Sequence, residues 1–310
     1  MQKRQYSIGD LEKLSGIKAH TIRVWERRHG VIKPERTDTN IRYYHEGELL
    51  KLLNISILIQ SGYRISKISD LGIEELRDLV IKTCAESDNP EILIETLIVA
   101  MLSLDEYKFL QVLNDSIDKR GIENTFEEIE IPFVKRLGLL CDEKTINEVQ
   151  RNFMFNLIRQ KLIVAIDSIK EDSFKAIGKR IVFFMPKAEW SEIILLFYSF
   201  VARKAGFEVL YLGPSIPLES LRSDNSINKN DILFLSLDST CSDSELNNEI
   251  VPFLNENYPD LLKFISGMNI KSKVEQMTKE LNNAKMVCSS DTLIAILTEL
   301  KNKDTAEPGC

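Results

Sequence analysis

The chain has 310 residues, of which 44% are hydrophobic and 28% are charged, and its formal net charge at pH 7 is −7. This length predicts two or three domains rather than one. No apolar run is long enough to span a bilayer and no signal-peptide core is visible, so we expect a cytoplasmic protein that does not contact a membrane. The five cysteines are scattered, which argues against a disulfide framework and against a zinc site.

The charge is distributed unevenly along the chain. Residues 1–67 hold 13 Lys and Arg against 7 Asp and Glu, whereas the remaining 243 residues hold 27 against 40. A basic segment in an otherwise acidic chain is typical of a nucleic-acid-binding domain. Only the first 67 residues are therefore suited to binding the phosphates of a nucleic acid.

Two short helices are predicted at the start of the chain. Ser7 and Asp10 form a capping pattern for a helix over residues 7–15, which Gly16 ends. A second helix is predicted over residues 20–28, with Gly30 as its end. Helices of this length joined by a tight turn form a helix-turn-helix, whose second helix enters the major groove. A short basic hairpin carrying Arg36 and Arg42 follows as a wing.

These residues resemble the MerR family of winged helix-turn-helix transcription regulators. The resemblance rests on Tyr6–Leu11, Thr21–Arg23, Pro34-x-Arg36-Thr37, Arg42-x-Tyr44 and Gly62. The run Trp25-Glu26-Arg27-Arg28-His29-Gly30 is similar to the cobalamin-dependent, light-responsive subgroup of that family. The match covers about the first 75 residues.

The resemblance implies double-stranded DNA with a two-fold operator as the partner, bound by a homodimer or a dimer of dimers near the bacterial nucleoid. Base contacts are expected from the second helix, and phosphate contacts from the arginines and from a wing tyrosine. Trp25 fits the core of a small domain as well as it fits a base contact. The expected DNA-binding residues are His20, Thr21, Arg23, Trp25, Arg27, Arg36, Arg42 and Tyr44.

A helical region follows the wing. Residues 46–60 form a helix with apolar residues on two sides, residues 66–71 and 73–79 continue as helix, and a domain junction is placed between about 76 and 90. Four helices are then predicted over residues 90–103, 104–120, 125–141 and 147–169, with a break at Gly121. Their apolar spacing predicts an antiparallel four-helix bundle. The long coiled coil by which most MerR proteins dimerise is not visible.

From residue 179 the hydrophobic pattern changes and predicts alternating strands and helices. Largely apolar strands separated by helices indicate a parallel sheet covered on both faces, and five such strands predict a flavodoxin-like, doubly wound domain. The predicted domains are therefore a winged head at 1–76, a bundle at 88–170 and an α/β domain at 178–302. The predicted strands are 180–185, 207–212, 232–237, 263–266 and 285–288.

A bundle followed by such a sheet resembles the cobalamin-binding module of methionine synthase type. The segments 150–162 and 211–217 are similar to its last bundle helix and to its second strand and loop. The departures lie at residues that handle the cofactor in that module. Cys141, Arg151 and Asn152 replace a Trp and a Glu-His pair. In the loop that reads E-x-H-x-x-G in the family, Glu189 is kept, but Ser191 replaces the cobalt-binding His and Ile194 replaces the Gly.

These departures predict a degenerate cofactor site, so we expect cobalamin binding to be lost and no cofactor or metal to be bound. The sequence contains no nucleophile with a base, no metal-ligand spacing and no phosphate-binding glycine motif, so an enzyme is not expected. The interpretation is a MerR-type regulator whose C-terminal module serves assembly or sensing. Two alternatives stay open: a working cobalamin-dependent photoreceptor repressor, and a corrinoid-binding or methyl-transfer protein.

Overall fold

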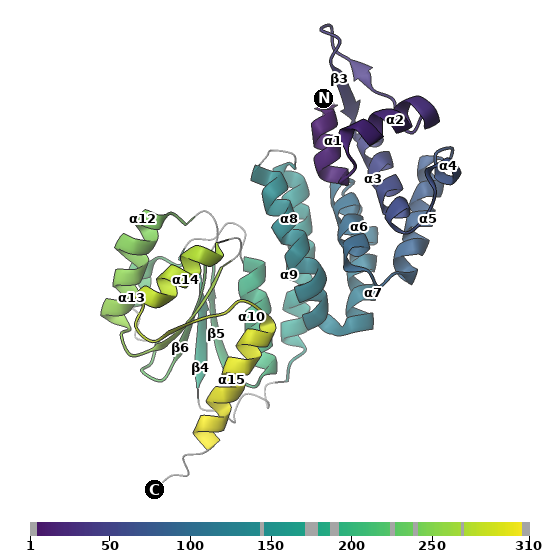
Figure 1. Cartoon of the computed structure of the whole chain (residues 1–310). Coiled ribbons are helices and arrows are strands. Elements are labelled where there is room, and N and C mark those ends of the chain that lie inside the picture. The colour runs from purple at the N-terminus through teal and green to yellow at the C-terminus, as the bar shows by residue number, and fades with distance from the viewer. Residues whose placement is uncertain are drawn as a thin grey trace. The chain divides into compact units, whose positions relative to one another are not determined.

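The computed structural model describes residues 5–142, 146–170, 179–186, 192–223, 227–237, 241–267 and 270–305, without the side chains of 138–142, 223 and 303–305. The chain forms two compact units, Met1–Leu157 and Ile158–Cys310. Figure 1 shows helices throughout the first unit and a sheet with helices in the second. No described helix is long and apolar enough to cross a membrane.

The first unit begins with a small sheet and two helices. Strands β1 (Gln5–Tyr6), β3 (Arg42–His45) and β2 (Glu35–Arg36) lie in the order β1-β3-β2, and both pairings are antiparallel. Helices α1 (Ile8–Ser15) and α2 (Ala19–His29) lie between β1 and β2 in the chain. The predicted helix-turn-helix and wing are therefore confirmed within about one residue.

Helices α3 (Glu46–Gln60), α4 (Ile65–Ile68) and α5 (Ile73–Glu86) follow the wing. Helix α3 is buried along most of its length, as its apolar residues on two sides predict. Two predictions of helix bounds were wrong here. Helix α4 ends earlier than predicted, and α5 continues to Glu86, through most of the expected domain junction.

The helical region contains α6 (Pro90–Leu102), α7 (Glu106–Thr125), α8 (Ile131–Asp142) and α9 (Glu148–Asp167). The predicted break at Gly121 is confirmed, because this glycine has a φ of 79° and a ψ of 165° inside α7. A π-helical turn that was not predicted, η1 (Phe126–Glu130), joins α7 to α8. The fully or nearly buried side chains of these helices include Phe109, Phe126 and Phe133.

The second unit contains a five-stranded parallel sheet in the order β5-β4-β6-β7-β8. This is the strand order of a flavodoxin-like fold, so the predicted class is confirmed. Its first three strands fall within one residue of the predicted ranges, while β8 begins and ends before 285–288. The strands are β4 (Arg180–Phe184), β5 (Glu208–Gly213), β6 (Ile232–Leu237), β7 (Leu262–Gly267) and β8 (Ala284–Met286).

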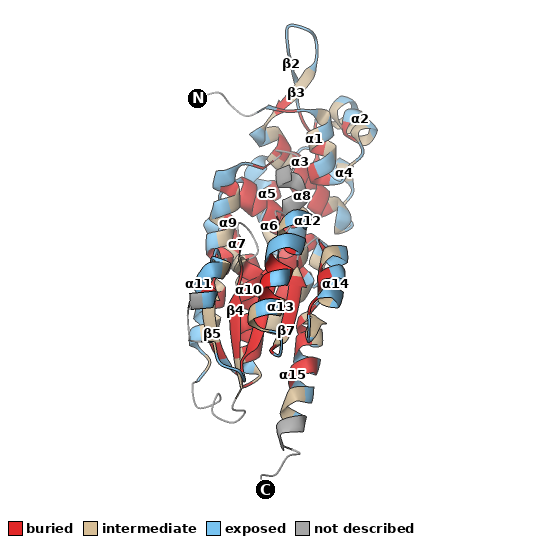
Figure 2. Cartoon of the chain, turned by 90° about the vertical axis from the view of Figure 1, so that its left-hand side faces the viewer, coloured by how far each residue is buried: buried red, intermediate tan, exposed pale blue. Residues whose placement is uncertain are grey.

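Helices cover both faces of this sheet. One face packs on α10 (Glu192–Lys204) and α15 (Ser290–Thr305), and here Phe183 stacks on Phe234 at 4.5 Å between ring centroids. The central strands β4, β6 and β7 are almost entirely buried (Figure 2). Two-sided burial explains why these strand sequences are largely apolar rather than alternating.

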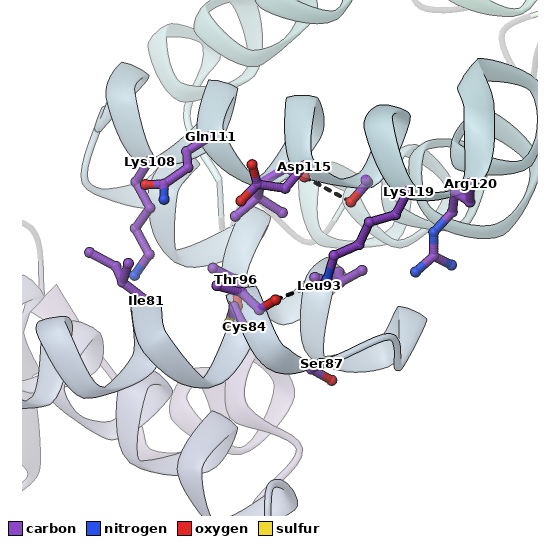
Figure 3. A pocket seen from close by; sticks show the side chains of 13 residues that line it. Ile81, Cys84, Ser87, Leu93, Thr96, Lys108, Gln111, Asp115, Lys119 and Arg120 are labelled. Atoms are coloured by element: carbon purple, nitrogen blue, oxygen red, sulfur yellow. Dashed lines mark hydrogen bonds between the residues drawn. The ribbon is translucent and has the colours of Figure 1, made fainter.

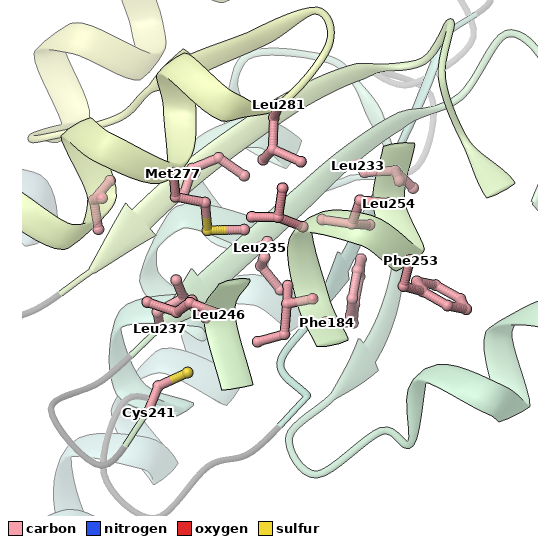
Figure 4. Packing of buried hydrophobic residues seen from close by; sticks show 14 of the residues in the cluster. Phe184, Leu233, Leu235, Leu237, Cys241, Leu246, Phe253, Leu254, Met277 and Leu281 are labelled. Carbon is pink, nitrogen blue, oxygen red and sulfur yellow. The ribbon is translucent and has the colours of Figure 1, made fainter. Parts of the chain in front are cut away.

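The other face holds a hydrophobic cluster that includes Phe184 and Leu235 from the strands, and Leu254 and Met277 from the helices (Figure 4). The helices on this side include the short helix α11 and a helical stretch over residues 243–257 that contains a π-helical turn. They are α11 (Leu218–Ser223), α12 (Asp243–Glu245), η3 (Leu246–Ile250), α13 (Val251–Asn257) and α14 (Lys271–Glu280).

Candidate functional site

Local sequence signals set the bounds of α1 and α2. The Ser7 hydroxyl accepts a hydrogen bond from Asp10 N, and the Asp10 carboxylate accepts one from Ser7 N at 2.7 Å. Gly16 and Gly30 end the two helices in the left-handed conformation, with φ of 69° and 59°. The turn between the helices is therefore fixed by residues that the sequence itself displays.

Helix α2 exposes most of its polar residues. Ile22 is its one fully buried residue, while His20, Arg23 and Arg27 are exposed and Thr21 is partly exposed. Trp25 is also partly exposed, so it is not a core residue. This surface offers cations and hydrogen-bond donors along one helix, as a helix that enters the major groove requires.

The wing is a short hairpin whose tip is exposed. Arg36 and Arg42 face each other as partners in the β2–β3 pair. Arg36 is exposed and donates a hydrogen bond to Asn40, which has a φ of 67° in the turn. At the tip, the side chain of Ile41 is 64% exposed. Figure 2 shows the loop of this hairpin as exposed. The predicted wing cation Arg36 is thus accessible to a phosphate.

Glu26 joins the wing to α2, and sequence reasoning did not assign it a role. Its carboxylate accepts hydrogen bonds from Arg42 Nε at 3.4 Å and from the Tyr44 hydroxyl at 3.3 Å. The Glu26 side chain is only 13% exposed, so this ion pair is shielded from solvent on one side. In the sequence, the indication that Glu26 has a role was its position within the run Trp25–Gly30, which carries part of the family resemblance.

Tyr44 does not fit its expected role as a phosphate contact. Its side chain is fully buried, and burial together with the neighbouring Glu26 carboxylate raises the pKa of Tyr44 to about 12. The correction has a simple physical reason: Tyr44 is the inward-facing residue of β3, and its hydroxyl is directed to Glu26. The geometry makes Tyr44 a residue that positions α2 against the wing.

The second candidate site is the carboxyl edge of the parallel sheet, where ligands of this fold class bind. Glu189 and Ser191 lie outside the described residues, as does the side chain of Cys141. Asn152 is exposed and Arg151 is half-buried, both on α9. The structure therefore describes only part of the predicted degenerate site.

The start of α10 at this edge is packed against the rest of the protein. The replacement residue Ile194 is 5% exposed, within an unbroken buried stretch of α10. Beside it in the chain, Glu192 at the start of α10 forms an ion pair with Arg159 at 3.3 Å. The Tyr211 hydroxyl is buried without a hydrogen-bond partner among the described residues, and burial with the Glu192 carboxylate raises its pKa.

These residues do not fit a cobalamin held by an axial imidazole. The three histidines of the chain are His20, His29 and His45, and all belong to the winged head. The branched side chain of Ile194 stands where the resemblance predicts the Gly that allows close approach of the cofactor. Among the residues that the structure describes, no group of His, Cys, Asp and Glu could hold a metal ion.

A cavity of about 500 Å³ also lies at this edge, next to α11 and α13. Its apolar wall includes Leu237, Cys241 and Phe253, and the Arg222 guanidinium lies 5.7 Å from the ring centre of Phe253. Arg222 Nη2 also pairs with Glu256 at 3.6 Å. The guanidinium of Arg222 is therefore already paired within the protein.

Comparison with known proteins shows which family the head is similar to. Residues 6–71 match the family described as MerR HTH family regulatory protein. The HTH-type transcriptional repressor CarH of Myxococcus xanthus is 25% identical over 230 residues, 71% of this chain and 75% of CarH. The HTH-type transcriptional repressor CarA of Myxococcus xanthus is 23% identical over 298 residues, 95% of this chain and 97% of CarA.

A solved structure shares the fold of about two thirds of the chain. The Methanosarcina barkeri monomethylamine corrinoid protein aligns with 67% of this chain and 96% of its own, with a TM-score of 0.52 and 14% sequence identity. This similarity concerns the fold alone, since the sequences have diverged so far. Residues 6–71 are therefore similar to the MerR HTH family, and the chain is similar to the CarH and CarA repressors over most of its length.

Proposed function

We propose that this protein is a transcription regulator that binds a two-fold DNA operator through α2 and the wing. The observation that carries this proposal is the arrangement around Glu26. One carboxylate holds Arg42 and Tyr44 of the wing strand against α2, while Arg23 and Arg36 remain exposed. Two exposed basic elements at a fixed spacing suit a helix in the major groove and a hairpin on the adjacent phosphates.

Gel shifts with a genomic fragment library test this proposal. Arg23→Ala is expected to weaken binding to all sequences and to lower the slope of log K against log salt by about one, because one phosphate contact is lost. Changes at His20 or Thr21 are expected to alter the preference among sequences instead. Lys135→Ala, at an exposed position of α8, is the matched control for loss of one positive charge. Absence of duplex binding at low salt would remove the regulator function.

Binding to a two-fold operator requires at least a dimer. The sequence shows no heptad pattern of a long coiled coil. The surface through which two copies of the chain associate is therefore expected in the helical region, the sheet domain or the head. Self-association is expected to be the same in the dark and in light. Light scattering of the free protein and of its DNA complex measures this, and a strict monomer in both would contradict it.

The second part of the proposal is that the sheet domain does not bind cobalamin and serves assembly or the sensing of another signal. The absence of histidine outside the head, the burial of Ile194 and the Arg159–Glu192 pair support it. Titration with adenosylcobalamin and methylcobalamin in the dark, followed by desalting, is the test. A red chromophore retained at one equivalent would instead favour a cobalamin-dependent photoreceptor repressor.

The double variant Ser191→His/Ile194→Gly provides a second test of cobalamin binding, because it restores two residues of the family's loop. Because Arg151 and Asn152 would still replace the expected cofactor contacts of the helical region, we expect the double variant to recover only part of the affinity.

A methyl-transfer function is disfavoured by the basic winged head, which a corrinoid enzyme does not need. We therefore place the protein in the cytoplasm, associated with DNA.

A further inference from the structure

Helix α3 joins the winged head to the helical region within the first unit. It packs on α1 of the head and on α5 and α6 of the helical region. Helix α5 is held in turn by α7, since Lys119 Nζ donates a hydrogen bond to Ala85 O at 2.9 Å (Figure 3). Apolar packing between helices permits small sliding movements. A directional polar contact on the head would therefore restrict its orientation further.

Such a contact links the helical region directly to α1. Arg136 of α8 donates a hydrogen bond from Nη2 to Leu14 O at 3.3 Å. The Nη1 atom of the same guanidinium lies 2.6 Å from Glu95 Oε1 of α6. The Glu95 side chain is 5% exposed, so this pair is shielded from solvent and fixes the direction of the guanidinium. One side chain therefore bridges α6, α8 and the last turn of α1.

The accepting carbonyl lies at the negative end of a helix. Leu14 and Ser15 are the last two residues of α1, and carbonyl groups at a helix end have no partner within the helix. The helix dipole favours a cation at this end. Ser56 Oγ of α3 donates to the neighbouring carbonyl, Ser15 O, at 2.9 Å. The end of α1 is thus held by α3 inside the head and by Arg136 outside it.

Helix α1 is tied closely to α2. The Glu12 carboxylate accepts a hydrogen bond at 3.2 Å from the backbone nitrogen of Ala19, the first residue of α2. The same carboxylate pairs with Lys18 at 3.3 Å. Only residues 16–18 lie between the two helices. A displacement of the end of α1 is therefore passed to α2 across one short turn.

We propose that Arg136 is a positioning residue for DNA binding, through which the helical region controls the orientation of α2. While the guanidinium bridges Glu95 and Leu14 O, α2 is held in the orientation that reads the operator. A change in the packing of α6 against α8 breaks this bridge and weakens DNA binding. The regulatory part of this inference rests on the proposed function, whereas the contact itself can be tested on the free protein.

A double variant removes the bridge without leaving a buried charge. Arg136→Ala alone would leave the Glu95 carboxylate unpaired, so Glu95→Leu/Arg136→Met is the variant of choice, because apolar residues often replace a buried ion pair without loss of stability. The net charge of the chain is unchanged, so its long-range attraction to DNA is retained. The control is Glu106→Gln/Lys135→Met, which also removes one charge of each sign, but at exposed positions.

Amide hydrogen exchange of the free protein tests the contact. In Glu95→Leu/Arg136→Met we expect amides at the end of α1 and the start of α2 to exchange about tenfold faster, the value of one hydrogen bond to a charged group. The amides of α5 and of the parallel sheet are expected to keep their rates, as is the whole control variant. Unchanged exchange at the end of α1 would overturn the proposal. Equally faster exchange throughout the first unit would also overturn it, because Arg136 would then be only a stabilising residue.

Gel shifts test the regulatory part, with a duplex that the parent protein selects from the genomic fragment library. We expect Glu95→Leu/Arg136→Met to bind this duplex about tenfold more weakly, because only the fraction of heads in the reading orientation binds. The slope of log K against log salt is expected to stay the same, since no phosphate contact is lost. The control variant is expected to bind like the parent protein.

Three outcomes of the gel shifts contradict different statements. Equal affinity of the parent protein and Glu95→Leu/Arg136→Met would overturn the control of α2 by the helical region. A smaller salt slope would show that Arg136 contacts a phosphate itself and is not a positioning residue. Failure of the parent protein to bind any duplex would instead remove the proposed function, and hydrogen exchange would still decide whether Arg136 holds α1.

Discussion

Glu130 is the residue whose ionisation is expected to dominate the pH dependence of stability. It lies in the π-helical turn η1, is fully buried, and neither of its carboxylate oxygens has a hydrogen-bond partner among the described residues. Burial alone raises the pKa of Glu130 from an ordinary value of 4.5 to about 8. The group is therefore protonated in the folded protein at neutral pH, although an exposed glutamate would be ionised.

The sign of the effect follows from the two pKa values. Below pH 4.5 the carboxyl is protonated in both states, so Glu130 adds no pH dependence. Between 4.5 and about 8 the unfolded chain releases a proton that the folded chain keeps, and stability falls as the pH rises. Each pH unit in this window costs roughly a factor of ten in the folding equilibrium, and the whole window costs about 5 kcal/mol. Above pH 8 the contribution is constant.

Glu130→Gln tests this account, because glutamine has the shape of the protonated acid and cannot ionise. We expect the variant to match the parent protein near pH 5 and to unfold at higher urea concentration near pH 8. Denaturation followed by circular dichroism across this range measures the difference. Glu106→Gln, at an exposed position of α7, is the control for loss of one carboxylate. A difference between parent and Glu130→Gln that does not grow with pH would refute the reasoning.

Three further predictions concern individual contacts. Tyr44→Phe removes a buried hydroxyl hydrogen bond and is expected to lower the unfolding free energy by about 1 kcal/mol without changing the salt dependence of DNA binding. Gly267→Ala places a Cβ 2.6 Å from Val274 Cγ2, so a loss of about 1 to 3 kcal/mol is expected in thermal unfolding. Arg136→Ala leaves the buried Glu95 carboxylate without its 2.6 Å partner, and urea unfolding is expected to show a loss of about 3 to 5 kcal/mol.

The ends of the first helices and the class of the second unit could be predicted because their signals are local. Ser7 with Asp10, and the glycines at 16 and 30, act within a few residues of their own positions, so the sequence displays the whole interaction. The largely apolar strands likewise carry their two-sided burial in their composition. The break at Gly121 belongs to this group, since only glycine adopts its backbone conformation at low cost.

Contacts between distant residues could not be predicted. Nothing near Tyr44 in the sequence indicates that its hydroxyl meets a carboxylate 18 positions earlier, which changes it from an expected phosphate contact to a positioning residue. Arg36 carried the same expectation, and its exposure leaves it accessible to a phosphate. The two residues differ in burial, which depends on the neighbouring elements of the fold and not on the local sequence.

The sequence by itself determined that this chain has a basic winged helix-turn-helix head, a helical region and a doubly wound sheet, and that its histidines are confined to the head. Periodicity, caps and composition are properties of short segments, and they act before the segments pack. Only the tertiary structure decided which ionisable groups are buried. Glu130 and Lys108 look in the sequence like ordinary surface residues of amphipathic helices, and their altered ionisation arises from the helices that enclose them.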